Sequence, residues 1–168
     1  MSPTGTLLAP SATPLCKDCN GAPIDLTPEA SASNSAASQL CQPCLRNRSE
    51  RKEILQEILK TELNYGRDLK IIRDEFYGPI KITGLLTPEQ LDSIFLNVDD
   101  LIEVNSELTA RLSSSMESSD QNDDLAWVNV GRIFNECADG MMNTFETYCK
   151  HQVSALALCK TMRAHGVK

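Results

Sequence analysis

The sequence predicts an all-α protein, an elongated antiparallel bundle of about four helices that follows a small cysteine-rich segment. Apolar residues recur at three- and four-residue steps through most of the chain after residue 53, which is the spacing of one helix face. A helix of about 25 residues is about 38 Å long, so segments of this length favour a long bundle over a compact cluster. Two cysteine pairs precede this region, and we expect the segment that holds them to be a separate module.

The first predicted helix runs from Glu53 to Phe76. Six apolar residues share one stripe that is expected to face a core: Ile54, Ile58, Tyr65, Leu69, Ile72 and Phe76. Four polar residues share a different face: Glu57, Thr61, Asn64 and Asp68. A polar row of this kind is usually a solvated surface, so periodicity alone does not make it a binding site. Gly78 and Pro79 are expected to end this helix.

Two further segments complete the predicted bundle. Thr87, Pro88 and Gln90 predict a capped helix start, and the helix is expected to continue to Leu112 before a loop over residues 113–124. Asn97 and Asn105 are expected near its packing face, where they would make buried polar contacts. Residues 125–164 predict more helix, in two pieces broken near Gly140. Its core is expected to include Trp127, Phe145 and Tyr148, with Cys137, Cys149 and Cys159 as small buried residues.

Composition excludes several classes of function. The 168 residues carry a net charge of −7, which argues against a nucleic-acid partner. No apolar run approaches the ~20 residues that span a bilayer, and the amino terminus lacks a secretory signal, so we expect a cytoplasmic, reducing location. Neither histidine lies in a catalytic motif and no glycine-rich phosphate loop occurs, so we expect no catalytic residues and no bond-making or bond-breaking enzyme.

The two cysteine pairs predict a metal site. Cys16 and Cys19 form one Cys-x-x-Cys pair, and Cys41 and Cys44 form the other. Four thiolates in two such pairs suit a tetrahedral structural zinc. Two alternatives stay open: a pair of disulfides, which a reducing compartment disfavours, and four free cysteines spaced by chance. The segment before the pairs, residues 1–15, is rich in Ser, Thr, Pro and Ala and is expected to be a flexible tail.

Three stretches resemble a known family. Residues 57–62, EILKTE, followed by Tyr65, Asp68 and Leu69, resemble the first similarity stretch of the Dbl-homology (DH, or RhoGEF) domain of Rho guanine nucleotide exchange factors. Residues 94–101, IFLNVDDL, resemble its second stretch, and Phe145, Tyr148, Cys149 and Ala155 resemble later positions. Gly66 departs from the pattern, since a β-branched residue is common there. The family's third stretch does not occur in this sequence, so the resemblance implies the amino-terminal part of a DH domain.

The resemblance implies an exchange factor that binds a Rho-family small GTPase and promotes GDP release without any cofactor of its own. It implies that Glu57 contacts switch 1, that Thr61 and Asn64 lie beside it, and that Glu62 also takes part. The expected division is a tail over residues 1–15, a cysteine module over 16–48 and a partial DH domain over 50–168, which alone would exchange weakly. An uncovered apolar face would favour self-association or a helical partner. The alternative is a helical adaptor without exchange activity.

Overall fold

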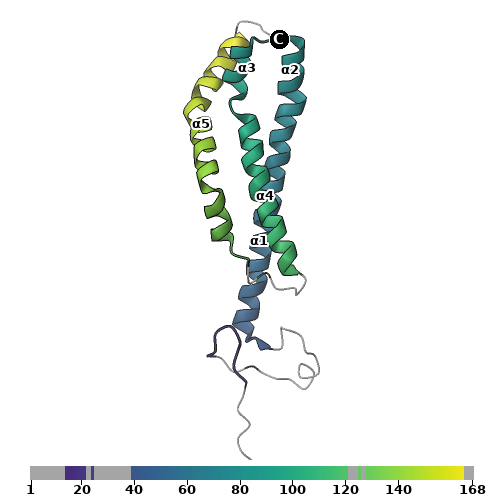
Figure 1. The fold of residues 1–168 in the computed structure, drawn as a ribbon, viewed down its shortest axis with the longest axis vertical. Helices are drawn as coiled ribbons and strands as arrows, with labels where there is room; N and C mark the ends of the chain where they lie inside the picture. The colour runs from purple at the N-terminus through teal and green to yellow at the C-terminus, as the bar shows by residue number, and fades with distance from the viewer. Residues whose placement is uncertain (1–13, 22–23, 25–38, 121–124, 126–127, 165–168) are drawn as a thin grey trace, which may run out of the picture. The chain divides into compact units, whose positions relative to one another are not determined.

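The computed structural model describes residues 14–21, 24, 39–120, 125 and 128–164 (Figure 1). The chain divides into two compact units, Met1–Glu53 and Ile54–Lys168, and each is described here by itself. This division separates two compact parts of the chain and does not test the three predicted boundaries. The tail over residues 1–15, the cysteine module over 16–48 and the partial DH domain over 50–168 therefore stay predictions. The predicted tail up to residue 13, the serine-rich stretch 31–38, Trp127 and residues 121–124 lie outside the described residues.

The all-α prediction is confirmed for the part of the chain that the structure describes. Helix α1 spans Gln42–Ile71 and contributes residues to both units. The π-helix η3 (Ile72–Tyr77) and helix α2 (Gly78–Thr83) follow it directly. Helices α3 (Pro88–Phe95), α4 (Val98–Asp120) and α5 (Val130–Ala164) complete the second unit. None of the described helices is both long enough and apolar enough to cross a membrane.

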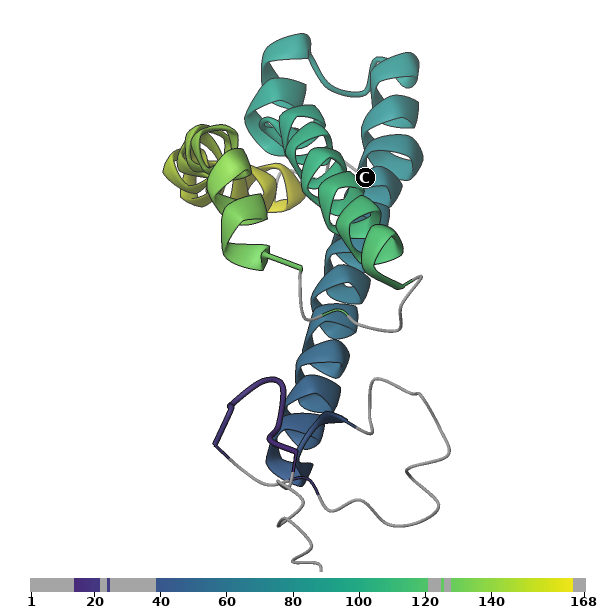
Figure 2. The same cartoon turned by 60° about the horizontal axis from the view of Figure 1, so that its bottom comes forward.

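In the second unit, α4 lies between α1 and α5, as both views show (Figures 1 and 2). One apolar cluster joins these three helices through residues that include Leu55, Leu108, Leu112, Ile133 and Cys137. A second cluster joins α1 to the start of α4 through residues that include Leu69, Val98, Leu101 and Ile102. The core therefore runs along α4 and fixes one face of α1 against it.

The predicted core stripe of the first helix is only partly correct. Leu69 is buried, but Ile54 and Phe76 are 55% and 54% exposed, and Ile72 is also exposed. The buried side of α1 instead follows Leu55, Gly66 and Leu69. The packing face of α1 lies slightly to one side of the predicted stripe, because several apolar residues of α1 lie outside the contact with α4.

Gly78 and Pro79 do not end the first helix, which corrects the prediction. Pro79 has no N–H to donate to the carbonyl four residues back, and its ring would crowd that carbonyl in an α-helix. The chain widens into η3 just before it, and the N–H of Gly78 donates to the carbonyl of Arg73, five residues back. The helical path ends at Gly84, whose φ of 64° is a left-handed conformation that glycine adopts without strain.

The capped start at Thr87 is confirmed. The hydroxyl of Thr87 accepts from the backbone N–H of Gln90, and the Gln90 side chain accepts from the backbone N–H of Thr87. The single helix predicted to follow it is wrong, because the chain breaks at Leu96, which has φ 53° and ψ −136°. The carbonyl of Asn97 then accepts from the N–H of Leu101, which starts α4.

Helix α4 also continues into the predicted loop, as far as Asp120. Ser113, Ser114 and Ser115 are helical, because buried Leu112 and Met116 on either side keep this part of the chain on the core. Helix α5 is continuous through Gly140, which corrects the predicted break near that residue. A single glycine weakens a helix by about 1 kcal/mol, which the packing of so long a helix can offset.

The cysteines of α5 do not behave alike. Cys137 is buried, as predicted, within the cluster that joins α1, α4 and α5. Cys149 and Cys159 are exposed, so the prediction that they are buried small residues is wrong. Their helical spacing matched the apolar pattern of α5, but this half of the helix has much of its apolar surface uncovered, including Val153 and Leu156.

Candidate functional site

The polar row of α1 is an exposed face of the second unit. Glu57, Thr61, Asn64 and Asp68 all have exposed side chains, as their shared face predicts. The hydroxyl of Thr61 donates to the carbonyls of Glu57 and Ile58, at 3.0 and 2.9 Å, so it is already used within the helix. Among the described residues, Glu57 and Asn64 make no side-chain hydrogen bond, which leaves one carboxylate and one amide available to a partner.

An exposed apolar residue borders this face. Ile54 lies one helical turn before Glu57, and its side chain is 55% exposed. Leu63 is also exposed, on another side of the same helix. The face around Glu57 therefore combines an unpaired carboxylate with apolar surface, a combination suited to a protein partner rather than to a small polar ligand.

Glu62 is placed differently from the other predicted contacts. Its side chain is half-buried and turns toward α4, where Nδ2 of Asn105 donates to its carboxylate Oε2 at 2.9 Å. The same Nδ2 lies 3.0 Å from the backbone carbonyl oxygen of Glu62. The structure thus brings Glu57, Thr61 and Asn64 together on one exposed face and holds Glu62 at the α1–α4 contact.

Two residues that sequence reasoning did not assign to the site make this contact. Gly66 is buried against Asn105, so close that a Cβ at position 66 would overlap the Asn105 amide oxygen. Asn105 is 6% exposed, which confirms the buried polar contact expected of it. The sequence did offer one indication of this contact, the departure of Gly66 from the family pattern. An isolated glycine within a helix often has a packing reason.

The four amino-terminal cysteines gather in the first unit. Their Sγ atoms all lie within 4.8 Å of one another, and Cys19 Sγ is 3.9 Å from Cys41 Sγ. All seven cysteines of the chain are thiols, so the alternative of two disulfides is not realised. Zinc–sulfur bonds of about 2.3 Å in a tetrahedron place sulfurs about 3.8 Å apart, close to the spacing found here. These four cysteines could hold a metal ion.

The backbone around each pair explains how the sulfurs converge. After the first pair, the N–H of Asn20 donates to the carbonyl of Cys16 at 2.9 Å, and Asn20 has a φ of 52°. Asparagine tolerates this left-handed conformation better than most residues, so the chain can turn tightly there. The second pair lies at the start of α1, where the carbonyl of Cys41 accepts from the N–H of Leu45.

The thiol pKa values within the cluster are pushed apart. Backbone N–H groups of Cys19 and then Cys41 lower the pKa of Cys16 to about 6. Hydrogen bonding to the Cys41 sulfur, with burial next, raises the pKa of Cys44 to about 12. One sulfur is thus readily ionised while another keeps its proton, mainly because of hydrogen bonds within the cluster and burial. Four thiolates without a cation would also repel one another. A cation between the sulfurs would remove that repulsion and favour four thiolates.

Contacts around the cluster hold the two pairs together. Arg48 donates to both carboxylate oxygens of Asp18, at 2.7 and 2.6 Å, and this lowers the pKa of Asp18. Ile24 and Leu40 are buried with Cys16 and Cys41, and Leu45 packs against them. The module therefore has a small apolar core of its own as well as a bidentate ion pair.

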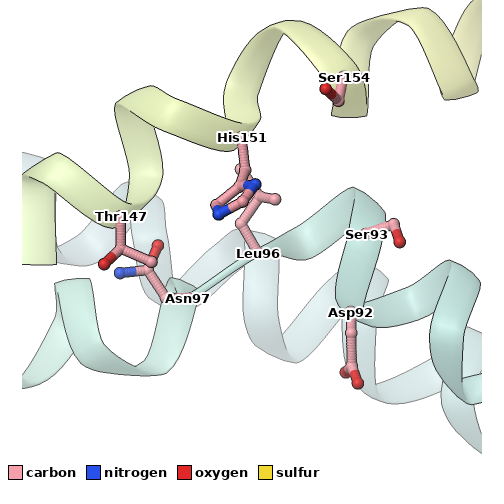
Figure 3. A pocket seen from close by; sticks show the side chains of 7 residues that line it. All are labelled: Asp92, Ser93, Leu96, Asn97, Thr147, His151 and Ser154. Carbon is pink, nitrogen blue, oxygen red and sulfur yellow. The ribbon is translucent and has the colours of Figure 1, made fainter.

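The second unit also has a surface cavity of about 360 Å³ between the α3–α4 break and α5 (Figure 3). Figure 3 shows Leu96 and Asn97 at the break, with Thr147 and His151 approaching from α5. Asn97 Nδ2 donates to the backbone carbonyl of Thr144 at 3.0 Å, which ties the break to α5. The Asn97 amide is thus a structural link between two helices, and none of the predicted contact residues lines this cavity.

The second unit is thus a helical bundle with an exposed, partly acidic face on its first helix. The RhoGEF domain family matches residues 54–167, and the chain belongs to this family. The matched range covers nearly all of the second unit and includes each of the predicted contact residues on α1.

Three relatives illustrate the likeness. The chain is 28% identical over 113 residues to the myosin-M heavy chain of Dictyostelium discoideum, covering 67% of this chain and 6% of that protein. It is 28% identical over 109 residues to Rho guanine nucleotide exchange factor 3 of Gallus gallus, covering 65% and 20%. It is 31% identical over 101 residues to Rho guanine nucleotide exchange factor 1 of Rattus norvegicus, covering 60% and 10%. The chain therefore spans a fifth or less of each of these relatives, and no solved structure matches it.

Proposed function

We propose that the protein is a guanine nucleotide exchange factor for a Rho-family small GTPase. Membership of the RhoGEF domain family supports this, and so do the names of two of the relatives. Such a protein makes and breaks no bond in its partner. It binds the nucleotide-free GTPase more tightly than the GDP-bound form, and this difference in affinity lowers the barrier to GDP release.

The observation that carries the proposal is the availability of Glu57. Its carboxylate is exposed, has no partner among the described residues and lies in the stretch that the family match covers. In the proposed complex, Glu57 contacts switch 1 of the GTPase, and Asn64 binds beside it from the same helix face. Ile54 would supply apolar contact, since it is exposed next to Glu57. Displacing the switch regions disturbs the magnesium and phosphate sites of the GTPase, and GDP leaves.

The proposed roles of Thr61 and Glu62 differ from that of Glu57. The Thr61 hydroxyl already donates its proton to carbonyls of α1, so it would contribute to a partner through its methyl group or as a hydrogen-bond acceptor. Glu62 is bonded to Asn105, and in the proposed site it sets the position of α1 on α4 as well as contributing charge near the partner.

Release of a fluorescent GDP analogue tests the proposal. The 168-residue chain is mixed with each of a panel of loaded Rho-family GTPases, and it should accelerate release from at least one of them. A second measurement, binding to the nucleotide-free GTPases, separates a weak exchange factor from an adaptor. If the chain neither accelerates release nor prefers any nucleotide-free GTPase, the helical adaptor without exchange activity is the better account.

We also propose that the ion held by Cys16, Cys19, Cys41 and Cys44 is zinc. Four sulfur ligands at a spacing close to a tetrahedron favour zinc over magnesium or calcium, which prefer oxygen. With four protein ligands there is no open coordination position, so the ion would stabilise the module and take no part in exchange. The reducing cytoplasm that the sequence predicts would keep the thiols available for the metal.

Finally, we propose that a helical partner or a second copy of the chain covers apolar side chains of the second unit. The exposed large residues of α5 include Met142, Val153 and Leu156, which are 70%, 74% and 54% exposed. Clusters of this kind mark interaction sites or favour self-association. Sedimentation over a range of concentrations tests the proposal; a chain that stays monomeric at all of them argues against self-association.

A further inference from the structure

The first turns of α1 carry charges that oppose a helix start. Its first turn contains no acidic residue. The first charged residue of the helix is the basic Arg46, which follows just after this turn. The amino end of a helix carries partial positive charge, so nearby cations destabilise it and anions stabilise it. Pro43 suits a first turn, but the charges at this end of the helix do not favour a start at Gln42.

The cysteine cluster supplies the missing negative charge. The carbonyl of Cys41 accepts from the N–H of Leu45 at 3.0 Å, so Cys41 occupies the cap position and Cys44 lies in the first turn. Both sulfurs belong to the four-cysteine cluster. Four thiolates around one divalent ion keep a net negative charge, and it lies at the amino end of α1. The metal site can thus supply the negative charge that the first turn of α1 lacks.

Residues of the first cysteine pair also reach the second turn of α1. Asp18 forms its bidentate ion pair with Arg48, and Leu45 packs against the apolar cluster around Cys16. These contacts depend on the first pair lying beside the second. A metal ion that binds both pairs would hold that arrangement together.

A second helix start lies inside α1. Asn47 and Glu50 have the spacing of a capping box. In such a box, the side chain of the cap residue accepts from the backbone N–H of the third helical residue. The side chain of that third residue accepts from the backbone N–H of the cap residue. In the structure these residues are helical, and Glu50 instead lies 3.6 Å from Arg46. The chain therefore has two alternative first turns: one beside the cysteines, the other at Asn47.

We infer that metal binding selects between these two starts: with the ion bound, α1 begins at Gln42, and without it α1 begins after Asn47. The inference rests on the proposed zinc site and not on exchange activity. Glu57 lies beyond both starts, so the proposed GTPase-binding face is helical in either state. Zinc would then control the order of the first turns of α1 and leave that face intact.

Amide hydrogen exchange of the full chain tests this directly, with stoichiometric zinc and after removal of the metal by a chelator. Chelation should make the amides of residues 45–49 exchange at least about tenfold faster, because their helical hydrogen bonds are lost. The amides from Leu55 to Tyr65 should not change. Cys16→Ser, which alters no residue of α1, should reproduce the chelated pattern in the presence of zinc.

Asn47→Ala gives a second, independent test. With zinc bound, the substitution should change little, since Asn47 is not the cap in that state. After chelation, it should extend the loss of protection past Glu50 to Arg51 and Lys52. Asn64→Ala, an exposed asparagine further along the same helix, is the matched control and should respond the same way in both states.

The outcomes separate the proposals. If zinc leaves and the amides of residues 45–49 stay protected, or if Asn47→Ala acts equally with and without zinc, the inference is wrong although the zinc site stands. If the chain binds no zinc, the inference and the zinc proposal both fail. Neither result bears on nucleotide exchange, which is measured with a GTPase and not by amide protection.

Discussion

Gly66 of α1 lies directly against Asn105 of α4, and there is no room for a side chain between them. Asn105 is buried, and its Nδ2 donates to both the carbonyl and the carboxylate of Glu62. Gly66 therefore lets α1 and α4 come close together. At this short distance Asn105 of α4 can hydrogen-bond to α1, the helix that carries Glu57. The contact links the packing of the bundle to the position of its exposed face.

Replacing this glycine should destabilise the bundle. The Cβ of Gly66→Ala would overlap the Asn105 amide, and overpacking of this kind usually costs about 1–3 kcal/mol. That exceeds the gain of about 1 kcal/mol in helix propensity. Urea denaturation should show a lower midpoint with an unchanged slope.

Gly140→Ala is the matched control for this substitution. Gly140 is exposed on α5, and the nearest atom to an added Cβ is a methyl carbon of Val104 at 4.0 Å, an ordinary contact. The same chemical change should therefore stabilise the protein here. If both alanine variants shift the midpoint in the same direction, the close approach at Gly66 is not the cause.

Glu62 should matter for stability in a way that Glu57 does not. Glu62→Ala removes a hydrogen bond between a carboxylate and a buried amide, a loss of about 1.5–3 kcal/mol. Glu62→Gln keeps an acceptor and should lose less. Glu57→Ala should stay within about 0.5 kcal/mol of the parent, because the side chain is exposed. Equal stability losses for Glu57→Ala and Glu62→Ala would contradict the placement of these two residues.

Acid should weaken the contact between α4 and α5. Arg132 donates to Glu136 at 2.7 Å and lowers the pKa of that carboxyl below its ordinary value of 4.5, with Arg111 adding to the effect from α4. A lowered folded-state pKa means that Glu136 stabilises the fold above its ordinary pKa, and that this stabilisation is lost as the pH falls through the lowered value.

Thermal melts of Glu136→Gln and the parent at neutral pH and at about pH 3 test this linkage. The parent should be the more stable at neutral pH, and the difference should shrink in acid. Glu103→Gln is the control, because Glu103 is an exposed residue of α4 with no ion pair in the described structure. A difference between parent and Glu136→Gln that grows in acid would contradict the sign of the shift.

Metal analysis tests the zinc proposal. Protein purified without a chelator should contain one zinc ion per chain, and Cys16→Ser should lose most of it, since a structural site needs all four ligands. Cys159→Ser is the matched control, because that thiol is exposed on α5 and outside the cluster. Zinc-free parent protein with all of its thiols titratable would rule the site out.

Some features of this molecule could be predicted from sequence because local chemistry determines them. The capping box at Thr87 needs only residues within one turn, and the exposed row on α1 needs only helical spacing. The spacing within each cysteine pair indicated a shared metal site, and the four sulfurs do lie together. The family resemblance added the proposed role of Glu57, which no periodicity indicates.

Other features depend on residues far away in the sequence. The break at Leu96 is tied to α5 through Asn97, whose Nδ2 donates to the carbonyl of Thr144. Glu62 is predicted to take part in GTPase binding with Glu57, but its carboxylate accepts a hydrogen bond from Asn105 on another helix. The exposure of Cys149 and Cys159 likewise depends on which side of α5 the other helices cover.

The central claim is that the exposed face around Glu57 promotes nucleotide release, and one pair of variants tests it most directly. Glu57→Ala and Glu103→Ala each remove an exposed carboxylate, the first from α1 and the second from α4. A charge-assisted hydrogen bond is worth about 1.5–3 kcal/mol, so Glu57→Ala should lower the chain's acceleration of GDP release from the responsive GTPase by about ten- to a hundredfold, down to the intrinsic rate where the acceleration is smaller than that. Glu103→Ala should match the parent, and both variants should keep the helical circular-dichroism spectrum. Release by Glu57→Ala at the parent rate, or equal losses for the two variants, would contradict the account.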